Sequence, residues 1–135
     1  MKKKVLIVTA SYYWDITGSL RAEAELLLED AKIKFDVIDV PGVFEIPVTI
    51  AKNIKKYDGF IALGCVIKGE TDHYDYICSS VSQGIMQLNL TSSIPIIFCI
   101  LTDHNKQQSI DRSGGKYGNK GVECAFAALQ MLSFK

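Results

Sequence analysis

The hydrophobic positions of this 135-residue chain follow two alternating spacings. Continuous apolar runs, rich in β-branched residues, are typical of buried strands, whereas apolar residues three or four positions apart predict helices. The predicted strands cover residues 5–9, 35–40, 59–67 and 94–101. The predicted helices cover residues 20–31, 46–54, 74–88 and 122–132, with a short additional helix that runs through residues 109 and 110.

Capping and turn residues mark the predicted element boundaries. Thr17 is expected to cap the first helix, and Thr102 or Asp103 the short one, because their side-chain oxygens can accept from free backbone N–H groups. Pro47 suits the first turn of a helix. A glycine-rich break at residues 113–118 separates the short helix from the last one.

The alternation of strand and helix predicts an α/β fold. Such an order favours a parallel sheet with right-handed crossovers, and strands that are apolar on both faces require helices on both faces. We therefore predict one domain over residues 1–135, a three-layer, flavodoxin-like α/β/α sandwich around four parallel strands. A sheet of only four strands leaves edges that a neighbouring subunit can extend.

Composition narrows the classes of function. The chain has 15 basic and 15 acidic residues, so its formal net charge of +0 gives no electrostatic footprint for nucleic acid. The segment 1–4 (MKKK) resembles the start of a signal peptide, but the apolar run behind it ends at residue 10 and meets no small-residue cleavage site. We expect no signal peptide and no membrane span, and therefore a cytoplasmic protein.

The four cysteines do not predict a metal site. They lie at positions 65, 78, 99 and 124. No two of them have the C-x-x-C spacing, and no pair of histidines lies near them in the sequence. We expect reduced structural thiols and no bound metal.

Candidate chemistry gathers where the predicted strands end, because ligands of open parallel sheets bind beyond the carboxyl ends of the strands. The segments that follow the four strands are residues 11–15, 41–45, 68–73 and 102–105. The first contains Tyr12, Tyr13 and Trp14, whose rings suit either a planar heterocycle or a subunit contact. Residue types alone leave both readings open.

The third segment has the features of a phosphate and proton-transfer site. Gly69 permits close backbone approach, the N-terminus of the next helix attracts anions, and Thr71 can cap that helix or donate to a phosphate oxygen. Glu70 would repel an anion unless it turns away. His73, in the first helical turn, can act as a base near pH 7, whereas His104 is expected to be structural.

The basic residues around the glycine-rich break, Arg112, Lys116 and Lys120, fit either phosphate recognition or a solvated loop. Several common nucleotide-binding patterns are missing from the sequence. It has no G-x-G-x-x-G and no Walker A pattern. It also lacks the acidic residues of a phospho-receiver domain and the Ser/Thr-rich phosphate loop of a flavodoxin.

Three long segments resemble the 6,7-dimethyl-8-ribityllumazine synthase family. They are residues 41–47 (PGVFEIP), 63–74 (LGCVIKGETDHY) and 112–121 (RSGGKYGNKG). The resemblance covers residues 5–132. It implies a transferase of riboflavin biosynthesis that condenses 5-amino-6-(D-ribitylamino)uracil with 3,4-dihydroxy-2-butanone 4-phosphate. The reaction releases phosphate and water and uses no cofactor.

The resemblance also implies roles for individual residues. His73 matches the proton-transfer residue of the family. The positions that match contacts to the pyrimidine and its ribityl chain are Tyr12, Val43, Phe44, Glu45, Cys65, Val66 and Ile67. The positions that match the phosphate site are Gly69, Glu70, Thr71 and Arg112. Phe98, Arg112 and Lys120 match residues that an adjacent subunit supplies.

The chain departs from the family pattern beside the stacking ring. Ser11 stands where many members carry a basic residue, Tyr12 replaces the more usual Phe or Trp, and Tyr13 replaces a common Asn. The family assembles as pentamers, so we expect a pentamer as the minimum unit. The short segment before the first strand argues against an icosahedral shell of pentamers and the uninterrupted glycine turn argues for one, so the shell stays open.

Two alternatives fit the same scaffold. A riboflavin synthase of this fold would dismutate two lumazines and would not need Gly69, Thr71 or Arg112. A flavin- or lumazine-binding protein would need Tyr12 and Glu45 but not His73 or Arg112. The presence of both sets of residues favours the lumazine synthase.

Overall fold

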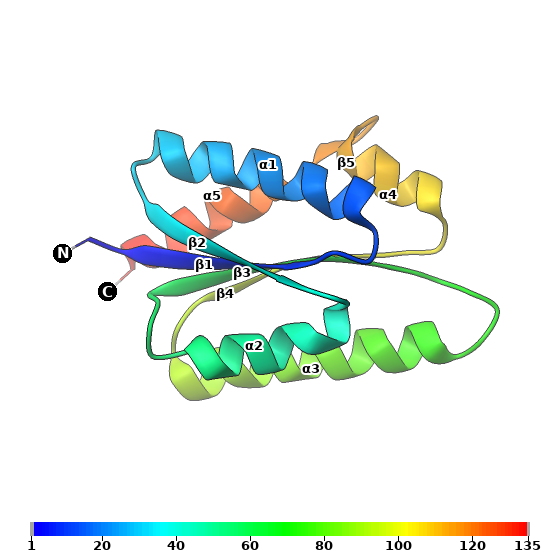
Figure 1. Ribbon diagram of the computed structural model, residues 1–135, viewed down its shortest axis with the longest axis horizontal. Helices are drawn as coiled ribbons and strands as arrows, with labels where there is room; N and C mark the ends of the chain where they lie inside the picture. Colours follow the sequence, from blue (N-terminus) through cyan, green and yellow to red (C-terminus); the bar gives the residue numbers. More distant parts are fainter. Residues whose placement is uncertain (1, 135) are drawn as a thin grey trace.

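Four parallel strands run through the centre of the molecule between two layers of helices (Figure 1). The structure is a computed structural model that describes residues 2–134. The strands are β1 (Lys4–Ala10), β2 (Lys34–Val40), β3 (Gly59–Ile67) and β4 (Ile96–Asp103). Their order in the sheet is β2-β1-β3-β4, with all three pairings parallel. The predicted three-layer α/β/α sandwich with a four-stranded parallel sheet is confirmed.

The helices divide between the two faces of the sheet (Figure 1). One face carries α1 (Trp14–Asp30), α4 (Lys106–Arg112) and α5 (Lys120–Ser133). The other carries the short 3-10 turn η1 (Val43–Glu45), α2 (Ile46–Asn53) and α3 (His73–Ser92). Within residues 2–134, none of these helices is both long and apolar enough to cross a membrane.

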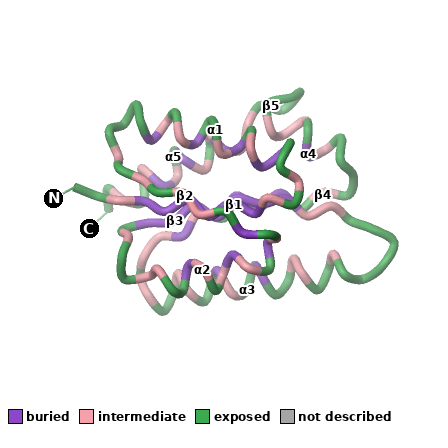
Figure 2. The backbone as a smooth tube through the Cα atoms, in the orientation of Figure 1, coloured by how far each residue is buried: buried purple, intermediate pink, exposed green. Residues whose placement is uncertain are grey.

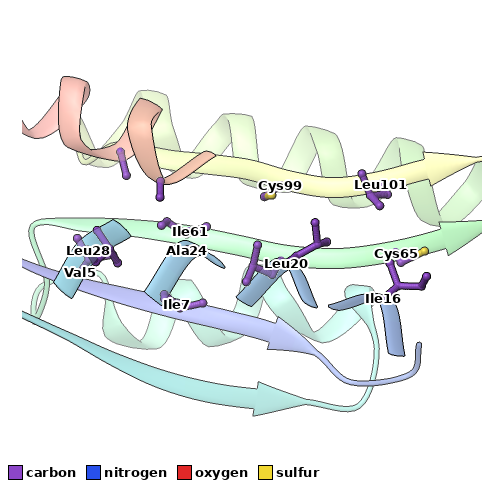
Figure 3. Packing of buried hydrophobic residues seen from close by; sticks show 13 residues of the cluster. Val5, Ile7, Ile16, Leu20, Ala24, Leu28, Ile61, Cys65, Cys99 and Leu101 are labelled. Carbon is purple, nitrogen blue, oxygen red and sulfur yellow. The ribbon is translucent and has the colours of Figure 1, made fainter. Parts of the chain in front are cut away.

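Alternate side chains of the central strands form two separate cores, because neighbouring residues of a strand point to opposite faces. Val5 and Ile7 of β1 pack under α1 and α5 (Figure 3). Leu6 and Val8 of the same strand pack against α2 and α3. The sheet is buried along most of its length, whereas the outer faces of the helices are exposed (Figure 2). This burial on both faces explains the continuous apolar runs in the sequence.

Two predicted helix caps are wrong. The first helix begins at Trp14, earlier than its apolar stripe indicates, and Thr17 lies buried inside it with its hydroxyl donating to the Tyr13 carbonyl. Thr102 and Asp103 belong to the end of β4, and Asn105 caps α4 instead by accepting from the Gln108 N–H at 3.0 Å. The prediction for Pro47 is confirmed, since it lies in the first turn of α2.

The glycine-rich break is an ordered hairpin. Residues Ser113–Gly115 (β5) and Gly118–Asn119 (β6) pair antiparallel beside α4 (Figure 1). Gly114 and Gly118 have φ angles of 117° and 82°, a region that side chains other than glycine rarely adopt. The glycines are therefore required by the turn, and the hairpin joins α4 directly to α5.

Candidate active site

A cavity of about 570 Å³ opens at the carboxyl ends of β1 and β3, the edge at which open parallel sheets bind their ligands. Its wall combines the loop after β1, the η1 turn, the end of β3 and the first turns of α3. The lining residues are Tyr12, Tyr13, Gly42, Val43, Phe44, Glu45, Cys65, Val66, Ile67, His73 and Ile77. Four separate stretches of the chain thus meet in one concave site.

Two of the three consecutive aromatic residues face this cavity. The rings of Tyr12 and Tyr13 meet edge to face with centroids 4.9 Å apart, and Tyr12 is 77% exposed. Burial, together with the neighbouring Tyr12, raises the pKa of Tyr13 above its usual range. Trp14 does not line the cavity; its ring stacks on the Arg21 guanidinium, 4.5 Å away. The exposed Tyr12 ring is therefore the face offered to a planar ligand.

The η1 turn contributes an apolar anchor, an exposed ring and a carboxylate. Val43 is buried against the sheet, whereas Phe44 is 59% exposed at the cavity wall. One carboxylate oxygen of Glu45, Oε1, accepts from the backbone N–H of Gly42 at 2.9 Å. This bond folds the Glu45 side chain against its own turn and fixes the carboxylate at the edge of the cavity.

The end of β3 supplies a thiol and two aliphatic side chains. Cys65 is buried, and Val66 and Ile67 are half-buried. Burial raises the pKa of the Cys65 thiol to about 11, so the thiol carries its proton at neutral pH. The four cysteines, Cys65 included, are free thiols, as the sequence predicts. Among residues 2–134, no group of three or more His, Cys, Asp or Glu side chains could hold a metal ion.

His73 begins α3 and is one of the residues that line the cavity. Its backbone N–H donates to the Thr71 hydroxyl at 3.4 Å, a long bond that links the helix start to the preceding loop. Gly69, Glu70 and Thr71 form this exposed loop between β3 and α3 and do not line the cavity itself. An added Cβ at Gly69 would meet no atom within 4 Å, so the loop is open to a ligand from outside.

A second concave surface lies along β4, which is an edge strand of the sheet. It encloses about 360 Å³ and contains Phe98 of β4 together with Lys120 at the start of α5. The Phe98 ring is 40% exposed there, and Lys120 Nζ lies 3.3 Å from a Glu123 carboxylate oxygen. Neither residue lines the cavity around Tyr12.

Arg112 also lies outside both concave surfaces. It ends α4, where Nη1 donates to the Gln108 carbonyl at 2.9 Å. Its guanidinium sits 5.1 Å from the centre of the Tyr117 ring in the hairpin. The α4 helix and the hairpin together hold this cation near the surface.

Comparison with known proteins identifies the family to which the chain belongs. The family model described as 6,7-dimethyl-8-ribityllumazine synthase matches residues 2–135. The chain belongs to this family. The resemblance drawn from the three sequence segments is confirmed, and with it the class of enzyme, a transferase of riboflavin biosynthesis.

Two curated lumazine synthases show how much of the chain is shared. The 6,7-dimethyl-8-ribityllumazine synthase of Flavobacterium johnsoniae is 54% identical over 95 residues, which make up 69% of this chain and 50% of that protein. The one from Phocaeicola vulgatus is 45% identical over 134 residues, 96% of this chain and 80% of that protein. The matched segment thus spans half the length of the first relative and four fifths of the second.

The fold brings together most of the residues that the resemblance to lumazine synthases singles out. The set that shares the first cavity is Tyr12, Val43, Phe44, Glu45, Cys65, Val66, Ile67 and His73. The set that lies outside it is Gly69, Glu70, Thr71, Phe98, Arg112 and Lys120. Ile77 lines the cavity but was not anticipated; its position one helical turn after His73 was the available signal.

Proposed function

We propose that this chain condenses 5-amino-6-(D-ribitylamino)uracil with 3,4-dihydroxy-2-butanone 4-phosphate to form 6,7-dimethyl-8-ribityllumazine, phosphate and water. The observation that carries the proposal is the cavity beyond β1 and β3, which combines an exposed aromatic face, a fixed carboxylate and an imidazole. These groups suit, in turn, a planar ring, a chain of hydroxyls and a proton transfer. No metal or organic cofactor enters the proposal.

In this proposal the pyrimidine binds between Tyr12 and the end of β3. The open face of Tyr12 stacks on the ring, while Cys65, Val66 and Ile67 meet the ring edge. The ribityl chain runs along the η1 turn past Val43 and Phe44, where the Glu45 carboxylate accepts from its hydroxyls. The Gly42 N–H that holds Glu45 supports this role, because it orients the carboxylate before the ligand arrives.

His73 is assigned the proton transfers. The aromatic amine attacks the ketone carbon, the carbinolamine loses water to give an imine, and phosphate leaves after a proton shift. The amine that carries the ribityl chain then adds to the remaining carbonyl, and loss of a second water closes the lumazine ring. A neutral imidazole can accept and return these protons. In the proposal the departing phosphate binds at the loop of Gly69, Glu70 and Thr71, beside the free backbone N–H groups that begin α3. His73 follows this loop directly, so one short segment serves both groups.

In this proposal a second copy of the chain supplies the remaining groups. Phe98, Arg112 and Lys120 do not line the cavity of their own chain, and Phe98 and Lys120 lie along the free edge of β4. A site completed by a neighbour accounts for this separation, with the Arg112 guanidinium of the partner subunit binding the phosphate as a fork. We propose a pentamer as the minimum assembly, with an icosahedral shell left open, and a cytoplasmic location.

The experiment mixes purified protein with the two substrates and follows lumazine absorbance and phosphate release together. The proposal predicts that both appear in a one-to-one ratio without added metal or cofactor. A riboflavin synthase would leave this mixture unchanged and would instead convert added lumazine to riboflavin without releasing phosphate. Tight binding of lumazine or flavin with no turnover would identify a binding protein.

A further inference from the structure

A chain of hydrogen bonds lies behind the cavity wall at Cys65. The Cys65 thiol donates to the Ser109 hydroxyl, with 3.3 Å between Sγ and Oγ, and the Ser109 hydroxyl donates to Oδ2 of Asp103 at 2.8 Å. Ser109 is fully buried on α4, Cys65 is 6% exposed on β3, and Asp103 ends β4. Only Cys65 of the three lines the cavity, so the chain runs from behind the site to its surface.

The carboxylate fixes the direction of every bond in this chain. A carboxylate oxygen can only accept, so the single hydrogen of the Ser109 hydroxyl is committed to Asp103. The Ser109 oxygen can then only accept, and the single hydrogen of the Cys65 thiol is committed to it. Because the thiol hydrogen is committed to Ser109, only the lone pairs of the Cys65 sulfur are left to interact with a ligand in the cavity.

We propose that Asp103, acting through Ser109, holds the Cys65 thiol as a hydrogen-bond acceptor toward the cavity, and that this acceptor selects ligands carrying an N–H donor at that wall. The inference rests on the proposed function for the identity of the ligand, a pyrimidine with ring and amine N–H groups. Asp103 and Ser109 are positioning residues, because neither touches the cavity.

Two neighbouring features maintain this chain of hydrogen bonds with the Cys65 thiol protonated. Burial, and to a smaller extent Asp103 and Asp15, raise the pKa of the Cys65 thiol to about 11. The hydrogen that sets the direction is therefore present at neutral pH. Lys106 Nζ also lies 2.8 Å from Oδ2 of Asp15, which ties the start of α4 to the start of α1 and so holds Ser109 behind β3.

The first test needs no substrate and measures the reactivity of the thiol. The full-length protein is alkylated with iodoacetamide at pH 9, and the modification of Cys65 is followed by peptide mass mapping. Ser109→Ala removes the acceptor that stabilises the neutral Cys65 thiol, so alkylation accelerates by roughly threefold or more. Asp103→Asn removes a negative charge that disfavours the thiolate, so alkylation accelerates by a similar factor. Alkylation of Cys78, on α3, serves as the internal reference.

Faster alkylation of Cys65, but not of Cys78, in both variants supports the hydrogen-bond chain. A Cys65 alkylation rate that is unchanged or slower in either variant overturns it, provided that circular dichroism and thermal unfolding match the parent protein. This outcome is independent of turnover, so it separates a failure of the inference from a failure of the proposed function.

The second test is a double-mutant cycle in steady-state kinetics. Asparagine at position 103 can donate to Ser109, which frees the Ser109 hydrogen and lets the thiol turn its own hydrogen toward the cavity. Asp103→Asn is therefore expected to raise KM for the pyrimidine roughly three- to tenfold, with KM for the butanone phosphate within about twofold. In a Cys65→Ala background the same substitution is expected to have no further effect.

An unchanged KM for the pyrimidine overturns the inference. An equal effect of Asp103→Asn with and without the Cys65 sulfur also overturns it, because a merely structural role of Asp103 would not depend on that atom.

Discussion

His73 differs from the other histidine of the chain by its surroundings. Its imidazole lies at the cavity with Glu45 and Tyr12, whereas His104 packs edge to face on Tyr74 with centroids 6.3 Å apart, outside the lining residues. Both histidines follow a strand of the sheet, so the sequence alone could distinguish them as proton-transfer candidates only by the residues next to them. The two residues therefore form a matched pair for testing the proton-transfer role.

We expect His73→Ala to lower kcat about ten- to a thousandfold without abolishing turnover, since one general base contributes a modest part of the rate and the bound substrates keep their proximity. His104→Ala is the control and is expected to keep the parent rate within about twofold. Steady-state kinetics with both substrates check this. Loss of all activity from a folded His73 variant, or an unchanged kcat, would contradict the assignment.

Tyr57, which does not line the cavity, makes the stability of the folded state depend on pH. Its hydroxyl donates to the Asp36 carboxylate at 2.6 Å, and this bond raises its pKa from the ordinary 10.0 to about 12. The folded state therefore holds the Tyr57 proton more tightly than the unfolded chain does. The resulting stabilisation is complete below pH 10 and is lost as the pH rises from 10 to 12.

Tyr57→Phe removes the hydroxyl and keeps the ring against Phe60, 5.8 Å between centroids. We expect the parent protein to melt at a higher temperature than this variant at pH 9, and the gap to close toward pH 12. Thermal unfolding at several pH values measures it. A gap that stays constant across this range would show that the Tyr57–Asp36 bond does not titrate as described.

At the scale of elements, the close approach of α5 to α1 depends on Gly121. An added Cβ there would collide with the Leu20 carbonyl oxygen, and Gly121 is fully buried at the start of α5. We expect Gly121→Ala to lower the free energy of unfolding by about 1–3 kcal/mol, because the two helices must move apart. Gly69→Ala, in an open loop, is the matched control and is expected to change it by less than about 0.5 kcal/mol. Urea denaturation compares the two, and equal effects would contradict this packing argument.

The periodicity of apolar residues predicted the strands and helices, but it did not predict the residues at which they begin and end. Val5 to Ile7 form a run that is apolar in every position, and burial on both faces of β1 is the only structure that satisfies it. Thr17 failed as a cap because its hydroxyl bonds back to Tyr13 inside the helix, a choice that residue type does not reveal. The glycines at 114 and 118 indicated a break, but they did not indicate the antiparallel pairing of residues 113–115 with residues 118–119.

At the scale of the whole molecule, the sequence located most of the site because the carboxyl ends of parallel strands meet at one edge. Tyr12, Glu45 and His73 come from three different segments, and the topology alone predicts their meeting. Phe98 and Lys120 are different. They share an edge strand and a neighbouring helix away from the cavity, and a single chain does not reveal which molecule they serve.

The central claim is that the reaction occurs in the cavity at His73 and needs Arg112 from a second copy. It is tested most directly by mixing two variants of strongly reduced activity, His73→Ala and Arg112→Ala, after unfolding and joint refolding in equal amounts. Each site then draws its histidine from one chain and its arginine from another. We predict recovery of roughly a quarter of the parent activity, since half of the chains supply each group intact. Activity no higher than that of the two variants refolded separately would contradict a site shared between copies.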